Sequence, residues 1–216
     1  MFTRGTTIFP RKPAYALSAL SILLASALAA PAASAADDAS AFVAGLGHHA
    51  IDIMKDRAIS VADRQHRFRT LMTEDFDLPK IAQFVLGSYW RNASEVEKQQ
   101  FTTAFGDYMA SLYSIRFGEY NVQSFRVTAQ HATSGTTTVV SSEITRLATG
   151  EEIDLDWIVA KTPDSYKVVD ITAGGASLSQ AQRAEFSSVV QRNGDSVPDL
   201  IRQLQMKSIE LATWGR

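Results

Sequence analysis

Three aspartates in the second half of the chain are the strongest candidates for chemistry. Asp154 and Asp156 lie two residues apart in a segment of alternating polar and apolar residues, and Asp170 lies in a similar segment. If adjacent strands buried two of these carboxyls together, their pKa values would separate, and the pair could act as acid and base in an isomerase or hydrolase. Alternation predicts instead that Asp154 and Asp156 face water. Asp170 is the remaining candidate, and it could instead anchor Arg183 or a backbone turn.

Other catalytic and metal-binding motifs are missing from the sequence. It has no cysteine, no G-x-S-x-G nucleophile motif and no phosphate-binding loop. Gly174-Gly175 follows a strand segment but lacks the spacing of a dinucleotide fingerprint. His48 and His49 are adjacent, so on a helix they point in different directions and do not bind one metal together. We therefore predict no catalytic residue, no metal site and no cofactor, and expect that the protein is not an enzyme.

The elements that would position these residues follow a helix, strand, helix order. Apolar residues recur at helical spacing between about residues 37 and 121, with helix starts near residues 37, 60, 77 and 94. Two more helices are expected after Ser179 and Ser196. The residues between these helical blocks predict an antiparallel meander of strands at 124–132, 136–148, 151–161 and 166–173. This order predicts an α+β fold with helices packed on one face of a curved antiparallel four-stranded sheet, an NTF2-like cone with an apolar pocket.

The segment from Val85 to Phe101 joins two of the helices. Ser94 and Glu97 have the spacing of a capping box, which fixes the start of the long fourth helix. Tyr89 and Trp90 form an aromatic pair that an ordinary surface turn does not need. We expect Tyr89 to face a pocket and Trp90 to pack structurally.

The fourth helix carries apolar residues around much of its surface, which is typical of a helix buried from two sides or bordering a cavity. In the third strand, Ile153, Leu155, Trp157 and Val159 share one face. The residues expected to line the pocket and hold its apolar ligand are Ile81, Val85, Tyr89, Phe105, Met109, Tyr113, Ile144, Leu155, Trp157, Val169 and Ile171.

The first 35 residues have the pattern of a secretory signal peptide. A basic start is followed by an Ala/Leu-rich stretch from Tyr15 to Ala30 and an A-x-A cleavage site at Ala33-Ser34-Ala35. We expect residues 1–35 to be cleaved and residues 36–216 to form one domain. The leader carries three of the 21 basic residues and none of the 23 acidic ones, so the remainder has a net charge of −5. This charge argues against a nucleic-acid partner.

Three segments carry a resemblance to a known family: VLGSYWRNAS at residues 85–94, Tyr166–Ile171 as a final strand, and Ser177-Leu178 after it. In these segments the chain resembles the MlaC or toluene-tolerance family of periplasmic lipid-binding proteins. Segments 182–186 (QRAEF) and 190–194 (VQRNG) are most similar to the hopanoid-associated HpnM branch. Two departures, AGGA at residues 173–176 and Tyr166 in place of a common Trp, fall where the resemblance implies the pocket mouth.

The resemblance implies a periplasmic carrier that binds a phospholipid or hopanoid and exchanges it between an inner-membrane transporter and outer-membrane lipid-handling complexes, serving outer-membrane lipid homeostasis. Two alternatives stay open. One is an enzyme of NTF2-like fold that acts on a hydrophobic substrate with Asp170 as acid or base. The other is an adaptor of a hopanoid export complex that binds no lipid.

Overall fold

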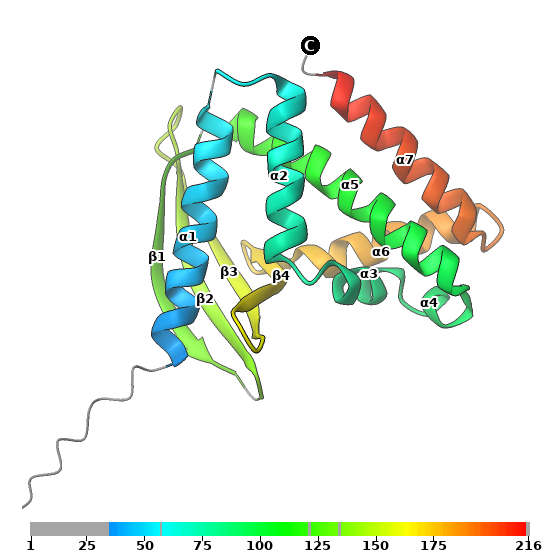
Figure 1. Ribbon diagram of the computed structural model, residues 1–216, viewed down its shortest axis with the longest axis horizontal. Helices are drawn as coiled ribbons and strands as arrows, with labels where there is room; N and C mark the ends of the chain where they lie inside the picture. Colours follow the sequence, from blue (N-terminus) through cyan, green and yellow to red (C-terminus); the bar gives the residue numbers. More distant parts are fainter. Residues whose placement is uncertain (1–34, 57, 121, 134, 215–216) are drawn as a thin grey trace, which may run out of the picture. The chain divides into compact units, whose positions relative to one another are not determined.

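A computed structural model of the chain describes residues 35–56, 58–120, 122–133 and 135–214, and their side chains except at 35–38, 117–120 and 214. The predicted leader lies outside the described residues except for Ala35, where the first helix begins. The helices of the described part are α1 (Ala35–Lys55), α2 (Val61–Asp75), α3 (Leu78–Leu86), α4 (Tyr89–Asn92), α5 (Glu95–Tyr120), α6 (Leu178–Arg192) and α7 (Val197–Trp214) (Figure 1).

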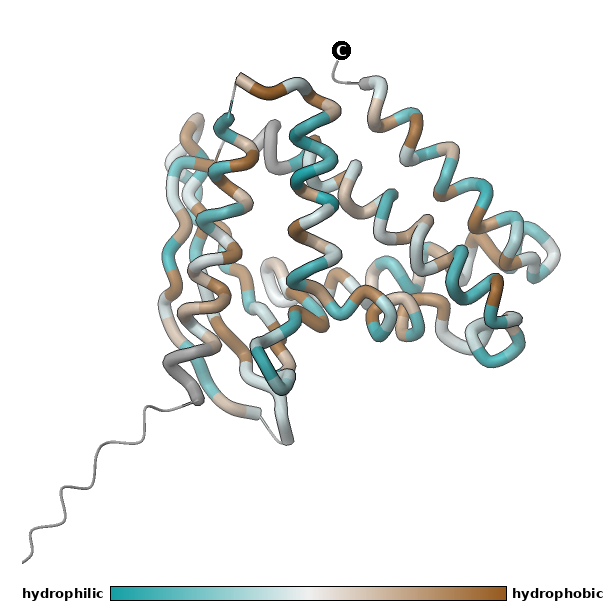
Figure 2. Tube along the Cα trace, viewed as in Figure 1, coloured by the Kyte–Doolittle hydropathy of each residue, from teal (hydrophilic) through white to brown (hydrophobic). Residues whose placement is uncertain are grey.

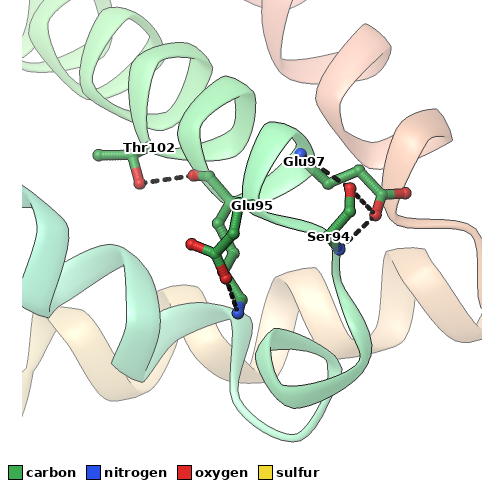
Figure 3. Close-up of polar contacts among 5 residues, drawn as sticks. Ser94, Glu95, Glu97 and Thr102 are labelled. Carbon is green, nitrogen blue, oxygen red and sulfur yellow. Dashed lines mark hydrogen bonds and ion pairs between the residues drawn. The ribbon is translucent and has the colours of Figure 1, made fainter.

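Short polar residues start α2, α3 and α5 where the sequence predicts them, whereas α1 begins at Ala35, two residues before its predicted start. Ser60 caps α2, and Asp77 caps α3 with Pro79 in the first turn. The capping box before α5 is formed: Glu97 N–H donates to Ser94 Oγ at 3.2 Å, and Ser94 N–H donates to the Glu97 carboxylate at 2.7 Å (Figure 3). The cap of α6 is Ser177, two residues before the predicted start. The single-turn helix α4, within the segment predicted as a connection, was not foreseen.

The strands form one antiparallel sheet in the order β1-β2-β3-β4-β5. Their bounds are β1 (Val122–Ala132), β2 (Thr137–Arg146), β3 (Glu152–Lys161), β4 (Tyr166–Ala173) and β5 (Ala176–Ser177). The predicted four-stranded meander is therefore present and gains a short fifth strand. Gly174 and Gly175, with φ of 56° and 79°, make the two-residue turn between β4 and β5, because this kind of hairpin turn requires positive φ at both positions.

The two faces of the sheet differ in polarity. Val140, Leu155, Trp157 and Val159 are buried on one face, whereas Asp154 on the other is exposed. A β-bulge interrupts this alternation in β4. Val159 pairs with Val168 and Ile158 pairs with Asp170, so Val169 between them has no partner. Val169 and Ile171 are both expected to line the pocket, but the extra residue shifts the alternation between them by one, so only Ile171 pairs with a residue of the apolar face, Trp157.

The helices pack against the apolar face and against each other. Helix α1 contacts β1 and β2, while α3 and α6 contact β4; α5 packs against α2, α3 and α7 (Figure 1). Hydrophobic and hydrophilic residues alternate along the helices (Figure 2), as expected for elements with one packed side. Phe101 and Phe105 stack with ring centroids 5.9 Å apart, and Phe186 meets both edge-on from α6. Within the described residues, no helix is both long and apolar enough to cross a bilayer.

Candidate functional site

An apolar cavity of about 220 Å³ lies between the helices and the sheet. It exceeds the engineered cavities of about 150 Å³ that hold a benzene molecule. Every layer of the fold contributes to its wall: α1, α2, α3 and α5, the middle strands β2 to β4, and the first turn of α6. The wall residues are Leu46, Ala50, Phe68, Leu71, Met72, Phe76, Leu78, Ile81, Phe105, Met109, Tyr113, Arg116, Ile144, Ile153, Leu155, Trp157, Asp170, Ile171, Ala173, Leu178, Ser179 and Gln182.

The structure brings most of the predicted lining residues together at this cavity. On α5, Phe105, Met109 and Tyr113 follow one another at intervals of four residues, so they lie on one side of the helix. The sheet supplies the opposite side through residues on its apolar face. The predicted residues found in the wall are Ile81, Phe105, Met109, Tyr113, Ile144, Leu155, Trp157 and Ile171.

Three predicted lining residues lie elsewhere. Val169 is the unpaired residue of the bulge in β4. Val85 is completely buried one turn beyond Ile81, where α3 has passed the cavity and its side chain belongs to the core. The hydroxyl of Tyr89 donates to Asp195 at 2.8 Å, and this hydrogen bond is the main cause of the raised pKa of Tyr89. Tyr89 thus ties α4 to the turn before α7, where Asp195 has a φ of 63°.

The contribution of α1 and α2 to the wall was missed in the sequence. Helix α2 is rich in charged residues, and its few large apolar side chains give a weak amphipathic signal. Phe68, Leu71 and Met72 nevertheless stand at i, i+3 and i+4, which places them on one face, and all three are buried. This apolar face is the sequence signal by which α2 could have been predicted to line the cavity.

Trp157 is held in the wall by polar and aromatic contacts. Its Nε1 donates to Ser142 Oγ at 2.8 Å, and both side chains are buried. Phe125 meets the indole edge-on, with ring centroids 6.0 Å apart. On the other side of Phe125, Gly47 of α1 leaves room for the phenyl ring. The indole orientation, and with it the cavity wall, therefore depends on residues from α1, β1 and β2.

Comparison with known proteins identifies the family of this chain. A model of the MlaC protein family matches residues 46–206, about three quarters of the sequence. The chain belongs to the MlaC family. A solved structure of similar fold is a phospholipid-binding protein from Ralstonia solanacearum, determined in complex with a phospholipid. It is 24% identical, with a TM-score of 0.69 over 82% of this chain and 99% of that one. All wall residues of the cavity lie inside the segment that matches MlaC.

The carboxylates of this MlaC chain are not arranged as an acid–base pair. Asp154 is exposed on the outer face of the sheet, and Asp156 on the same face accepts a hydrogen bond from Ser141 at 2.6 Å. Asp170 reaches the cavity, but its carboxylate accepts hydrogen bonds from Ser177 Oγ at 2.5 Å and from the Ser179 N–H at 3.1 Å. It therefore anchors the start of α6, which is the second of the two roles suggested for it other than catalysis.

Arg183 is not the partner of Asp170. Its guanidinium lies over the ring of Phe84, 5.1 Å from the centroid, and beside Gly87, whose φ is 62°. No cluster of three or more His, Cys, Asp or Glu side chains suited to a metal ion occurs among the described residues.

Proposed function

We propose that this protein is a periplasmic lipid carrier that encloses acyl chains in the cavity between its helices and sheet. The observation that carries the proposal is the wall itself. Of the 22 described residues that line it, only Arg116 and Asp170 are charged, and the remaining large side chains except Gln182 are apolar or aromatic. A pocket of this composition gains free energy from apolar groups and offers little to a polar ligand.

Hydrophobic transfer energies explain why such a cavity suits a carrier. A diacyl lipid has on the order of thirty methylene groups, and at about 0.8 kcal/mol each their exposure to water costs roughly 25 kcal/mol. Transfer from a bilayer into an apolar cavity replaces one apolar medium by another and is close to neutral. The direction of transport then depends on the relative affinities of donor and acceptor partners.

The other parts of the proposal rest on the sequence and on family membership. The signal-like leader supports export to the periplasm, where an inner-membrane transporter and outer-membrane lipid-handling complexes would be the partners. The phospholipid bound to the Ralstonia solanacearum protein supports a phospholipid as ligand. Segments 182–186 and 190–194 support a place in the hopanoid-associated branch, with a hopanoid as the alternative ligand.

Native purification followed by lipid extraction and mass spectrometry tests the proposal. We expect phospholipid or hopanoid at near-stoichiometric amounts. Protein that is folded and empty after purification under lipid-preserving conditions would refute the carrier and favour the adaptor.

A pair of methionine variants links the bound lipid to the cavity. Met109 is buried in the wall, whereas Met206 on α7 is 62% exposed. Met109→Glu places a charge in the apolar cavity and should remove the lipid, while Met206→Glu should leave the lipid content unchanged. Circular dichroism of both variants shows whether loss of lipid occurs in folded protein. Equal lipid content in folded Met109→Glu would contradict the assignment of this cavity.

A further inference from the structure

The polar groups of the cavity wall that remain available to a ligand come from α5 and α6. Ser179 donates its backbone N–H to Asp170, whose carboxylate is already shared with Ser177. Two polar side chains of the wall, Arg116 and Gln182, lie outside this hydrogen-bonded group. They offer a guanidinium and a carboxamide to a bound lipid.

Arg116 marks the place where the cavity meets solvent. Among the described residues that line the cavity, it alone is exposed. A long cationic side chain in this position covers apolar surface with its methylenes and keeps its charge in water. Arg116 forms no ion pair with any side chain that the structure describes. With respect to the described residues, its charge is available to an anionic group at the opening.

Gln182 presents an acceptor that lacks a donor. Its Oε1 is buried and receives no hydrogen bond from the described residues. A buried acceptor without a partner is unfavourable, so a ligand that supplies an N–H or O–H donor at this point gains from it.

The two side chains belong to the same region of the molecule. Tyr108 of α5 packs against Phe186 of α6, with ring centroids 6.3 Å apart. Burial raises the pKa of Tyr108, the charge of Glu185 raises it further, and the charge of Arg116 lowers it. Glu185 lies three residues after Gln182, on the same side of α6. The same phenol therefore lies near Arg116 and near the segment of α6 that carries Gln182.

We propose that Arg116 and Gln182 form a headgroup subsite, which selects acyl lipids that carry an oxyanion next to a hydroxyl or ammonium donor. This inference rests on the proposed carrier function, because a headgroup is held there only when acyl chains fill the cavity. The guanidinium binds the phosphate or carboxylate by a charge-assisted hydrogen bond, and the carboxamide oxygen accepts from the donor. An uncharged lipid with the same chains lacks the first of these interactions.

Binding of matched dioleoyl lipids tests the subsite. Delipidated protein is titrated with phosphatidylethanolamine, which has a phosphate and an ammonium donor, with phosphatidylcholine, which has the phosphate alone, and with uncharged dioleoylglycerol. Arg116→Gln should lower the affinity for both phospholipids about tenfold, which corresponds to about 1.4 kcal/mol, and leave the affinity for dioleoylglycerol unchanged. Gln182→Leu should reduce the preference for phosphatidylethanolamine over phosphatidylcholine. Arg91→Gln, which removes an exposed arginine outside the wall, is the matched control.

The outcomes separate the subsite from the carrier function. If wild-type protein binds all three lipids equally and Arg116→Gln behaves like Arg91→Gln, the subsite is refuted and the carrier stands. If wild-type protein binds none of the lipids, the carrier function itself fails. A parallel titration with oleate identifies the oxyanion: binding of oleate that depends on Arg116, without binding of the phospholipids, assigns the subsite to a fatty-acid carboxylate.

Discussion

Replacement of Gly47 by alanine is the most direct test of how α1 is fitted to the sheet. A Cβ atom at residue 47 would lie 2.4 Å from Cε1 of Phe125, 2.5 Å from its Cδ1 and 2.6 Å from its Cζ. Such overpacking costs about 1–3 kcal/mol. Alanine in place of glycine inside a helix also gains about 1 kcal/mol of helix propensity, so the net loss from Gly47→Ala alone is about 0–2 kcal/mol.

The matching substitution at Gly45 separates the overpacking cost from the gain in helix propensity. Gly45 lies in the same helix, and a Cβ there meets nothing within 4 Å. Gly45→Ala should therefore gain the propensity term alone, and the difference between the two variants should equal the overpacking cost of about 1–3 kcal/mol. For a domain of this size, each kcal/mol corresponds to a change of about 2–4 °C in Tm.

Urea unfolding of the two variants and the wild type gives the free energies, and lipid content is measured on the same samples. A displaced Phe125 presses on Trp157 in the cavity wall, so we also expect less bound lipid in Gly47→Ala than in Gly45→Ala. Equal stabilities of the two alanine variants would refute the close contact between α1 and Phe125.

Three further substitutions test individual contacts. Asp170→Asn weakens the hydrogen bonds that start α6 and should cost about 1–2 kcal/mol in urea unfolding while lipid remains bound; a hydrophobic substrate whose turnover is lost in this variant would revive the enzyme hypothesis. Trp157→Phe leaves the buried Ser142 hydroxyl without its donor, and a double-mutant cycle with Ser142→Ala should give a coupling energy of about 1 kcal/mol; additive effects would contradict the hydrogen bond. The Ser94 backbone and side-chain hydrogen bonds lower the pKa of Glu97 below its ordinary value of 4.5, so the stability they provide is complete above that value and is lost as the pH falls through the lowered pKa. In Glu97→Gln, the free energy of unfolding should therefore fall less steeply as the pH is lowered. An unchanged pH dependence would exclude a contribution of the Glu97 carboxylate to stability.

The fold class and the order of elements were predictable because they depend on local signals. Helix starts at Ser60, Asp77 and Ser94 follow from a short polar side chain that accepts a backbone N–H within three residues. The strands follow from alternation between short turns. Neither signal requires knowledge of distant contacts, and both are present in the structure.

The cavity wall was only partly predictable because it combines distant elements. Periodicity identifies the packed face of α5 and β3, and residues there such as Met109 and Trp157 are in the wall. Periodicity does not show where along a helix or strand the cavity ends. For this reason Val85 was predicted to line the cavity, although its side chain belongs to the core. Tyr89 was predicted to face the pocket but lies outside the wall for another reason. Its hydrogen-bond partner Asp195 is 106 residues away, and no local sequence pattern joins the two.

The bulge at Val169 changes the sheet face on which the following residues of β4 lie, and with it the role of the neighbouring Asp170. Without the bulge, regular alternation after Val168 would carry Asp170 to the apolar face opposite Trp157 and turn Ile171 to the outer face. With the bulge, Ile171 pairs with Trp157 and Ala173 with Leu155, so both re-enter the apolar face and line the cavity. Asp170 is left at the margin, where its carboxylate meets the first turn of α6. The departure from alternation therefore keeps the cavity apolar and fixes the helix that carries Gln182.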